Sequence, residues 1–166
     1  MLIIIGGLPA AGKTTIARAL AREIGAAHLR IDTIEQAIVR SGAGSHPLGP
    51  AGYSVGYAVA EDQLRLGLTV IAESVNPLEV TRAAWRSVAE RTGHPALEIE
   101  VVCSDETEHQ QRASTRTIDI EGLAGPTWQQ ILDREYEPWA GEHTVLDTAG
   151  RSLDSCVAQV RKEIGV

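Results

Sequence analysis

Four residues near the amino terminus have the types and spacing of a phosphate-binding loop. Gly7, Gly12, Lys13 and Thr14 match the pattern GxxxxGK[ST] within the stretch GLPAAGKT. Glycines let backbone N–H groups turn inward around an anion, and the positive end of the following helix adds to the attraction. We expect Lys13 to reach the outer phosphates of a nucleotide, Thr14 to bind Mg²⁺, and Thr15 to donate a further hydrogen bond. The predicted nucleotide-binding residues of this loop are Gly7, Leu8, Pro9, Ala10, Ala11, Gly12, Lys13, Thr14 and Thr15.

The neighbours of this loop are those that the pattern requires. A short apolar run, Leu2 to Ile5, precedes it, and a segment of helical period rich in Ala, Leu and Arg, Lys13 to Ile24, follows it. The order strand, loop and helix distinguishes a phosphate-binding loop from a Gly-rich turn that holds no ligand.

Asp32 ends the second apolar run, HLRID. It is therefore expected at the carboxyl edge of a parallel strand, where ligands bind in open α/β sheets. There it could accept a proton from a substrate hydroxyl or orient that hydroxyl toward a γ-phosphate. A second interpretation is structural, because Asp32 followed by Glu35 is a capping-box pattern for a helix over Thr33 to Arg40. The sequence leaves both roles open, and the two can coexist.

Glu73 ends the third apolar run, TVIAE, at the same predicted edge. A P-loop protein holds its Mg²⁺ from this place with a Walker B carboxylate, and Asp is the more usual residue. With the longer Glu, coordination of the metal directly or through water stays open. In the following SVNP stretch, Ser74 and Asn76 either point polar groups into the cleft or form only an Asn-Pro turn.

Arg112 and Arg116 lie four residues apart in DETEHQQRASTRT, so both are expected on one face near the end of a helix. Arginines delivered by a closing segment stabilise the negative charge of a transferring phosphoryl group. The alternative is that they pair on the surface with Glu106, Glu108 or Asp119, or favour the helix C-terminus. Arg40 is either a contact for an acidic or phosphorylated substrate or a surface residue.

Two other familiar patterns do not predict function here. GYSVG, Gly52 to Gly56, fits the nucleophile elbow of hydrolases, but no buried strand precedes Ser54. VLDTAG, Val145 to Gly150, is similar to a GTPase switch, but no guanine-reading NKxD motif occurs in the chain.

The elements that must position these residues alternate along the chain, which predicts an α/β fold with a parallel sheet and helices on both faces. The expected strands are Leu2 to Ile5, His28 to Ile31, Thr69 to Ala72, Leu97 to Cys103 and Thr144 to Leu146. The expected helices are Lys13 to Ile24, Thr33 to Arg40, Tyr53 to Leu66, Leu78 to Thr92, Glu106 to Thr115, Trp128 to Trp139 and Ser155 to Ile164. Two long loops, Ser41 to Gly52 and Thr117 to Thr127, are expected to be mobile and functional.

Composition limits the classes of partner. The chain has 166 residues and a formal net charge of −7, without a basic stripe, which argues against a general nucleic-acid binder. No apolar run approaches the length of a membrane span, so we expect a cytoplasmic protein. Cys103 and Cys156 lack metal-like spacing and are expected to be reduced core thiols.

The order of these parts resembles the small P-loop kinases of the nucleoside-monophosphate-kinase type, in particular the AAA_33, zeta-toxin-like family with its gluconate-kinase-like and chloramphenicol-phosphotransferase-like members. The stretches that carry the resemblance are GLPAAGKTT, RID, AEDQLRLGLTVIAESVNP, QRASTRTIDIEGLAGPTWQQILDREYEPW and VLDTAG.

The resemblance implies a three-layer P-loop NTPase fold with a five-stranded parallel sheet of order 2-3-1-4-5. It implies that Asp32 lies by the acceptor, that Arg112 and Arg116 belong to a lid over residues 112–127, and that Thr148 to Arg151, with Thr148 and Gly150 as contacts, border the adenine. Residues 41–57, including Tyr53 and Tyr57, would cover the acceptor site.

These observations together predict a single domain, residues 1–166, that is an ATP- and Mg²⁺-dependent kinase acting on a hydroxyl of a small molecule. In this prediction Lys13, Asp32, Arg112 and Arg116 are catalytic, Arg112 also binds the nucleotide, and Thr14 and Glu73 hold the metal. A polynucleotide or tRNA 5′-hydroxyl kinase, a motor ATPase and a non-catalytic ATP sensor are the alternatives. The sequence does not identify the acceptor or the oligomeric state.

Overall fold

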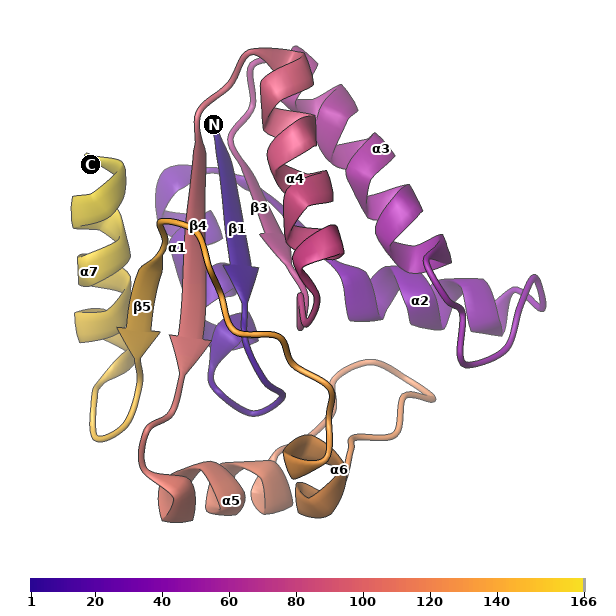
Figure 1. Ribbon diagram of the computed structural model, residues 1–166, viewed down its shortest axis with the longest axis vertical. Helices are drawn as coiled ribbons and strands as arrows, with labels where there is room; N and C mark the ends of the chain where they lie inside the picture. The colour runs from indigo at the N-terminus through magenta and orange to yellow at the C-terminus, as the bar shows by residue number, and fades with distance from the viewer. Residues whose placement is uncertain (166) are drawn as a thin grey trace.

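The sheet at the centre of the molecule has five parallel strands in the order β2-β3-β1-β4-β5. The computed structural model describes residues 1–165 (Figure 1). The strands are β1 (Leu2–Gly6), β2 (Ala27–Arg30), β3 (Val70–Glu73), β4 (Ala96–Val102) and β5 (Thr144–Asp147). Both the predicted fold class and the predicted strand order are confirmed.

Seven helices connect and follow these strands within residues 1–165. They are α1 (Lys13–Ile24), α2 (Ile31–Arg40), α3 (Ala51–Arg65), α4 (Glu79–Thr92), α5 (Glu106–Thr115), α6 (Trp128–Leu132) and α7 (Leu153–Ile164). Helices α1 and α7 cover one face of the sheet and α3 and α4 the other, whereas α5 and α6 lie beyond the carboxyl ends of the strands (Figure 1). Parallel strands require such crossover helices, which leave one sheet edge free for a site.

The alternation of side chains along β1 divides the core into two layers. Ile3 and Ile5 pack with α1 and α7, and Leu2 and Ile4 pack with α3 and α4, all four being fully buried. Strand β1 is therefore apolar on both faces, as expected for the central strand of a parallel sheet. Cys103 and Cys156 are buried and unpaired, as predicted.

Several predicted helix boundaries are wrong. Helices α3 and α7 begin two residues earlier than predicted, at Ala51 and Leu153, and two further differences affect the site. Helix α2 begins at Ile31 rather than Thr33, so β2 is followed at once by a helix and Asp32 lies in its first turn. The helix predicted over Trp128 to Trp139 ends at Leu132. Pro138 cannot donate a backbone hydrogen bond, and the segment before it is non-helical and largely exposed; in it the Glu137 N–H donates to the Pro77 carbonyl at 2.8 Å.

The helices of residues 1–165 do not include one with the length and apolar character needed to cross a bilayer.

Candidate active site

The loop between β1 and α1 has the backbone of an anion cradle. Gly7, Ala10 and Gly12 all have positive φ, at 135°, 66° and 105°. At Gly7 a side chain is also excluded by space, because a Cβ there would lie 2.1 Å from the carbonyl oxygen of Val101. This strand-loop-helix arrangement directs the N-terminus of α1 at the loop, as phosphate binding requires.

Lys13 is the buried cation of this loop. It is only 8% exposed, and its Nζ donates to the Leu8 carbonyl at 2.8 Å. Burial lowers the pKa of Lys13 to about 8, although Glu73 and Asp32 act in the opposite direction. The ammonium group therefore lies within the electrostatic reach of both predicted carboxylates.

Two residues from other elements fix the carbonyl groups of the loop. The Thr148 hydroxyl, after β5, donates to the Ala11 carbonyl at 2.9 Å. His109 of α5 is buried, and its Nε2 lies 2.8 Å from the Pro9 carbonyl oxygen. His109 was not predicted from the sequence, because a single histidine in a polar helix carries no motif.

Thr14 and Glu73 meet at the predicted metal position. The Thr14 hydroxyl donates to Glu73 Oε1, and His28 Nε2 lies 2.8 Å from Oε2. Burial alone would raise the pKa of Glu73, but the hydrogen bonds from His28 and Thr14 and the charge of Lys13 outweigh it and lower the pKa. Glu73 is thus an ionised, almost fully buried carboxylate beside a hydroxyl, an oxygen pair that suits Mg²⁺.

Asp32 lies in the same cleft but does not cap α2. The N-cap residue is Arg30, and no side chain makes a cap hydrogen bond there. The capping-box interpretation of Asp32 is therefore wrong. Because β2 ends one residue earlier than predicted, the side chain that reaches the cleft from the strand end itself is Arg30, and Asp32 reaches it from the first turn of the helix.

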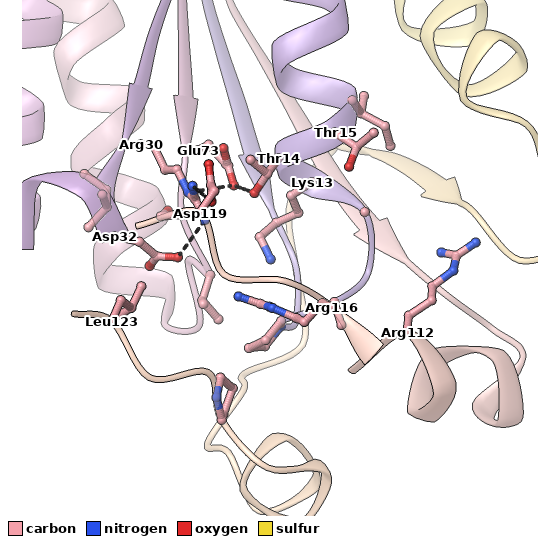
Figure 2. A pocket seen from close by; sticks show the side chains of 18 of the residues that line it. Lys13, Thr14, Thr15, Arg30, Asp32, Glu73, Arg112, Arg116, Asp119 and Leu123 are labelled. Carbon is pink, nitrogen blue, oxygen red and sulfur yellow. Dashed lines mark hydrogen bonds and ion pairs between the residues drawn. The ribbon is translucent and has the colours of Figure 1, made fainter. Parts of the chain in front are cut away.

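Arg30 connects the strand edge to the predicted lid. Its side chain is 7% exposed, and its Nη1 donates to Asp119 Oδ1 at 2.8 Å, while its Nε lies 3.8 Å from Glu73 Oε1. Arg18 of α1 forms a second ion pair with Asp119; Figure 2 shows the lid residue Asp119 beside Arg30. These hydrogen bonds from arginine lower the pKa of Asp119 well below its usual range. The sequence analysis had offered Asp119 only as a surface partner for Arg112 or Arg116.

Arg112 and Arg116 do not share a helix face, so this prediction is wrong. Helix α5 ends at Thr115, and Arg116 has an extended backbone with ψ 136°. As a result Arg116 points toward Lys13 while Arg112 points away from it (Figure 2). Arg112 donates to the Thr148 hydroxyl at 2.8 Å and to Glu108 at 2.5 Å, which partly agrees with the predicted pairing to glutamate.

The loop after β5 is held against this arginine. The Arg112 guanidinium also donates to the Thr148 carbonyl at 3.1 Å, and the Gly150 N–H donates to Glu108 Oε2 at 2.9 Å. Thr148 and Gly150, which were predicted to border the adenine, are therefore brought together with Arg112 of the lid, and Glu108, for which only a surface ion pair was expected, links them.

The opposite end of the cleft is formed by α2, α3 and the residues after β3. Glu35, Tyr53 and Ser74 line it. The Tyr53 hydroxyl accepts the Asn76 N–H at 3.1 Å, and burial raises the pKa of Tyr53. Of the two residues in SVNP, Ser74 lies in the cleft, and Asn76, fully buried with φ 55°, forms the turn.

One cleft of about 800 Å³ joins these parts. Its lining includes the phosphate loop, Glu73, Asp32, the lid and the loop after β5, so the structure unites residues separated by more than a hundred positions. Thr15 is exposed and also lines the cleft.

Two further residues considered from the sequence lie outside the cleft. Arg40 forms an ion pair on the surface with Glu121 at 3.3 Å. Ser54 is an exposed residue of α3, as expected for a chance match to the hydrolase pattern.

Comparison with known proteins agrees with this geometry. The family model AAA_33, an AAA domain, matches residues 2–134. Comparison with curated proteins gives no match.

Among similar solved structures is Kti12 of Chaetomium thermophilum in complex with ADP-AlF3, with 21% identity and a TM-score of 0.73 over 99% of this chain and 97% of that chain. Another is the APS kinase of Mycobacterium tuberculosis in complex with AMPPNP and APS, with 15% identity and a TM-score of 0.72 over 99% and 97%. A gluconokinase of Sinorhizobium meliloti 1021 has 19% identity and a TM-score of 0.65 over 98% and 94%. At these identities the likeness shows a common P-loop kinase-like fold.

Proposed function

The chain belongs to the AAA_33 family of AAA domains, as its motifs predicted, and from this premise we propose that it is an ATP- and Mg²⁺-dependent kinase. The kinase transfers the γ-phosphate of ATP to a hydroxyl group of a small molecule. The observation that carries the proposal is the presence of Lys13, Glu73 and Asp32 in one cleft, where both carboxylates act on the pKa of the lysine.

The phosphate loop and Lys13 form the donor side of this proposal. Backbone N–H groups of Gly7 to Gly12 bind the phosphates, and the Lys13 ammonium exchanges its bond to the Leu8 carbonyl for the outer phosphates. The Arg116 guanidinium, which has no hydrogen-bond or ion-pair partner within residues 1–165, points at the same place and neutralises charge that develops on the transferring group. The lysine binds the donor, and the lid arginine acts when the lid covers it.

The nucleoside side lies at the loop after β5. Thr148 and Gly150 contact the adenine base. Arg112, which is held by hydrogen bonds to Thr148 and Glu108, lies over the same base. This assigns Arg112 to nucleotide binding rather than to the transferring phosphate, because its guanidinium is directed away from Lys13 (Figure 2).

The oxygen pair Thr14 and Glu73 fits a resident Mg²⁺. Within residues 1–165 no group of three or more His, Cys, Asp or Glu side chains could hold a metal alone, so phosphate oxygens and water would complete the ligand set. When bound, the ion neutralises negative charge on the phosphates of the donor. His28 keeps the Glu73 carboxylate ionised and oriented.

Asp32 forms the acceptor side. The acceptor hydroxyl oxygen attacks the γ-phosphorus, the bond from that phosphorus to the β–γ bridging oxygen breaks, and ADP leaves with the bond electrons. The hydroxyl proton passes to the Asp32 carboxylate. Positioning of the two reactants supplies much of the acceleration, because the protein does no covalent chemistry itself.

The experiment that tests this proposal is a transfer assay with γ-labelled ATP, Mg²⁺ and a panel of sugars, sugar acids, amino sugars and nucleosides. We expect label in at least one small molecule, dependent on Mg²⁺ and lost in Lys13→Ala. Label found only in inorganic phosphate would contradict the proposal.

The same assay separates the alternatives. A polynucleotide kinase would label the 5′-hydroxyl of an oligonucleotide and bind it with strong salt dependence. A nucleotide sensor would bind ATP with Mg²⁺ and label nothing. The net charge of −7 favours the small-molecule acceptor over the oligonucleotide.

A further inference from the structure

The acceptor end of the cleft contains a carboxylate without a protein partner. Glu35 of α2 lines the cleft three residues after Asp32, and it makes no hydrogen bond or ion pair within residues 1–165. It is only partly exposed and packs closely on α3, where a Cβ at Gly52 would lie 2.3 Å from Glu35 Cγ. Partial burial of an unpaired carboxylate costs free energy unless a ligand supplies the missing partner.

A second polar group at this end is also unpaired. Ser74 is 4% exposed and lines the cleft, and within residues 1–165 its Oγ makes no hydrogen bond of ordinary geometry, although it lies near enough to the Tyr53 hydroxyl to act on its pKa. It follows Glu73 directly at the end of β3, on the same side as Tyr53. A buried hydroxyl that lacks a partner indicates that a polar ligand completes this end of the cleft.

Arg134 apart, the cations near this end of the cleft pair with protein carboxylates or face the donor. Arg30 donates to Asp119, and Lys13 and Arg116 lie at the phosphate loop (Figure 2). Arg134, exposed after α6, also lines the cleft, and its charge lowers the pKa of both Lys13 and Glu35. His46 is exposed, and its Nε2 lies 3.5 Å from Gln36 Oε1.

We propose that the acceptor is a hydroxyl compound that carries a protonated amino group, and that Glu35 binds this ammonium group while Asp32 orients the hydroxyl. The inference rests on the proposed kinase function and adds the class of its acceptor. Ser74 Oγ then accepts or donates a hydrogen bond to a further polar group of the acceptor. An anionic acceptor such as a sugar acid would have to approach the two carboxylates of Asp32 and Glu35 at close range, which like charges oppose.

The electrostatics of this end agree with the geometry. Burial raises the pKa of Glu35, and the neighbouring Asp32 raises it further, whereas His46 and Arg134 act in the opposite direction. A bound ammonium group would favour the ionised carboxylate and form a charge-assisted hydrogen bond with it. The ammonium does not react, because its nitrogen has no free electron pair while it stays protonated.

The test uses acceptors matched in shape and different in charge. Amino sugars, aminocyclitols and amino alcohols are compared with their N-acetylated forms and with sugar acids, with γ-labelled ATP and Mg²⁺, and kcat/KM is measured for each. We expect the amines to exceed their N-acetylated forms by at least about tenfold, the value of one hydrogen bond to a charged group.

Three variants separate recognition from folding. Glu35→Gln keeps the size of the side chain, and we expect it to reduce the ratio of amine to N-acetylated acceptor by about tenfold or more, mainly through KM. Glu35→Lys should shift the preference toward sugar acids. Glu90→Gln, on the exposed face of α4, removes the same charge elsewhere and should leave the ratio unchanged.

The outcomes distinguish this inference from the function on which it rests. Preferred phosphorylation of neutral or acidic acceptors, or an unchanged ratio of amine to N-acetylated acceptor in Glu35→Gln, would overturn the inference. Neither result would contradict the proposed kinase function. Absence of transfer to every member of the three sets would overturn the proposed function and this inference together.

Discussion

Arg30 donates a hydrogen bond to Asp119 at 2.8 Å across 89 positions of sequence. The arginine ends β2 beside the predicted acceptor residue, and the aspartate belongs to the loop after α5 that carries Arg116. The pair therefore connects the lid to the sheet edge, where Glu73 ends β3 and Asp32 follows in the first turn of α2. Arg18 of α1 adds a second ion pair to the same carboxylate.

Loss of the ion pair between Arg30 and Asp119 should make opening of the lid easier. In Asp119→Asn the buried Arg30 loses its closest ionic partner, and we expect local opening to become easier by about 1 kcal/mol, because Asp119 itself is 43% exposed and partly screened. Trypsin cleavage after Arg116 should then be roughly fivefold faster, since cleavage follows the open population.

A neighbouring ion pair provides the control for the lid. Glu121 pairs with Arg40, and both side chains are exposed, at 83% and 58%. Glu121→Gln should therefore leave the cleavage rate within about twofold, as expected for an exposed pair. Equal rates in Asp119→Asn and Glu121→Gln would show that Asp119 does not hold the lid.

Substitution of the two lid arginines should change different kinetic parameters. Arg116 points at Lys13, so Arg116→Ala should lower kcat by about 10²-fold or more with a small change in the KM for ATP. Arg112 contacts Thr148, so Arg112→Ala should chiefly raise the KM for ATP. Steady-state kinetics measure both, with Arg22→Ala, exposed on α1, as control. The same kinetic change in both variants would contradict the assignment of Arg116 to phosphoryl transfer and of Arg112 to nucleotide binding.

Binding of ATP should weaken at alkaline pH through Lys13. In the protein without ATP, burial lowers the pKa of Lys13 to about 8, and only the protonated side chain attracts phosphate. Above pH 8 the protonated fraction falls tenfold per pH unit, while bound phosphate raises the pKa in the complex. We therefore expect the Kd for ATP to rise between pH 8 and 9.5 in calorimetry. The dependence should vanish in Lys13→Ala, and a Kd unaffected by pH in the wild type would refute this account.

Asp32→Asn should separate chemistry from stability. The side chain makes no cap bond in α2, so the free energy of unfolding should change by less than about 1 kcal/mol, the value of a charge near a helix N-terminus. If Asp32 takes the hydroxyl proton, kcat should fall by 10² to 10⁴-fold, roughly the contribution of a general base. Asp62→Asn, exposed on α3, is the matched control. Turnover near that of the wild type would remove Asp32 from the mechanism.

The fold followed from local signals that agree with one another. The apolar strands, the Gly-rich loop and the helix of Lys13 to Ile24 each specify their own conformation, so the phosphate loop and the sheet edge were predictable. The resemblance supplied the strand order, which periodicity alone does not determine.

The missed parts of the site depend on contacts between distant segments. Nothing in TIDIEG distinguishes Asp119 from a surface acid, because its partners Arg18 and Arg30 lie about a hundred positions earlier. The sequence pattern predicts Glu35 in a capping box, but α2 begins two residues earlier than predicted and has no side-chain cap bond. The short helix α6 also could not be foreseen, since the extension of Arg134 to Trp139 is fixed by tertiary contacts such as Tyr136 to Glu100 at 2.9 Å.

The most direct test of the kinase is the identity of the phosphorus-containing product. Phosphorus-31 NMR follows ATP, Mg²⁺ and an acceptor from the panel with the wild type, with Lys13→Ala and with Lys162→Ala, which removes the other lysine of the chain from an exposed position on α7. The account predicts a phosphate monoester of the acceptor in amounts equal to ADP for the wild type and Lys162→Ala, and none for Lys13→Ala. Inorganic phosphate as the sole partner of ADP, or an equal yield of ester from Lys13→Ala, would contradict it.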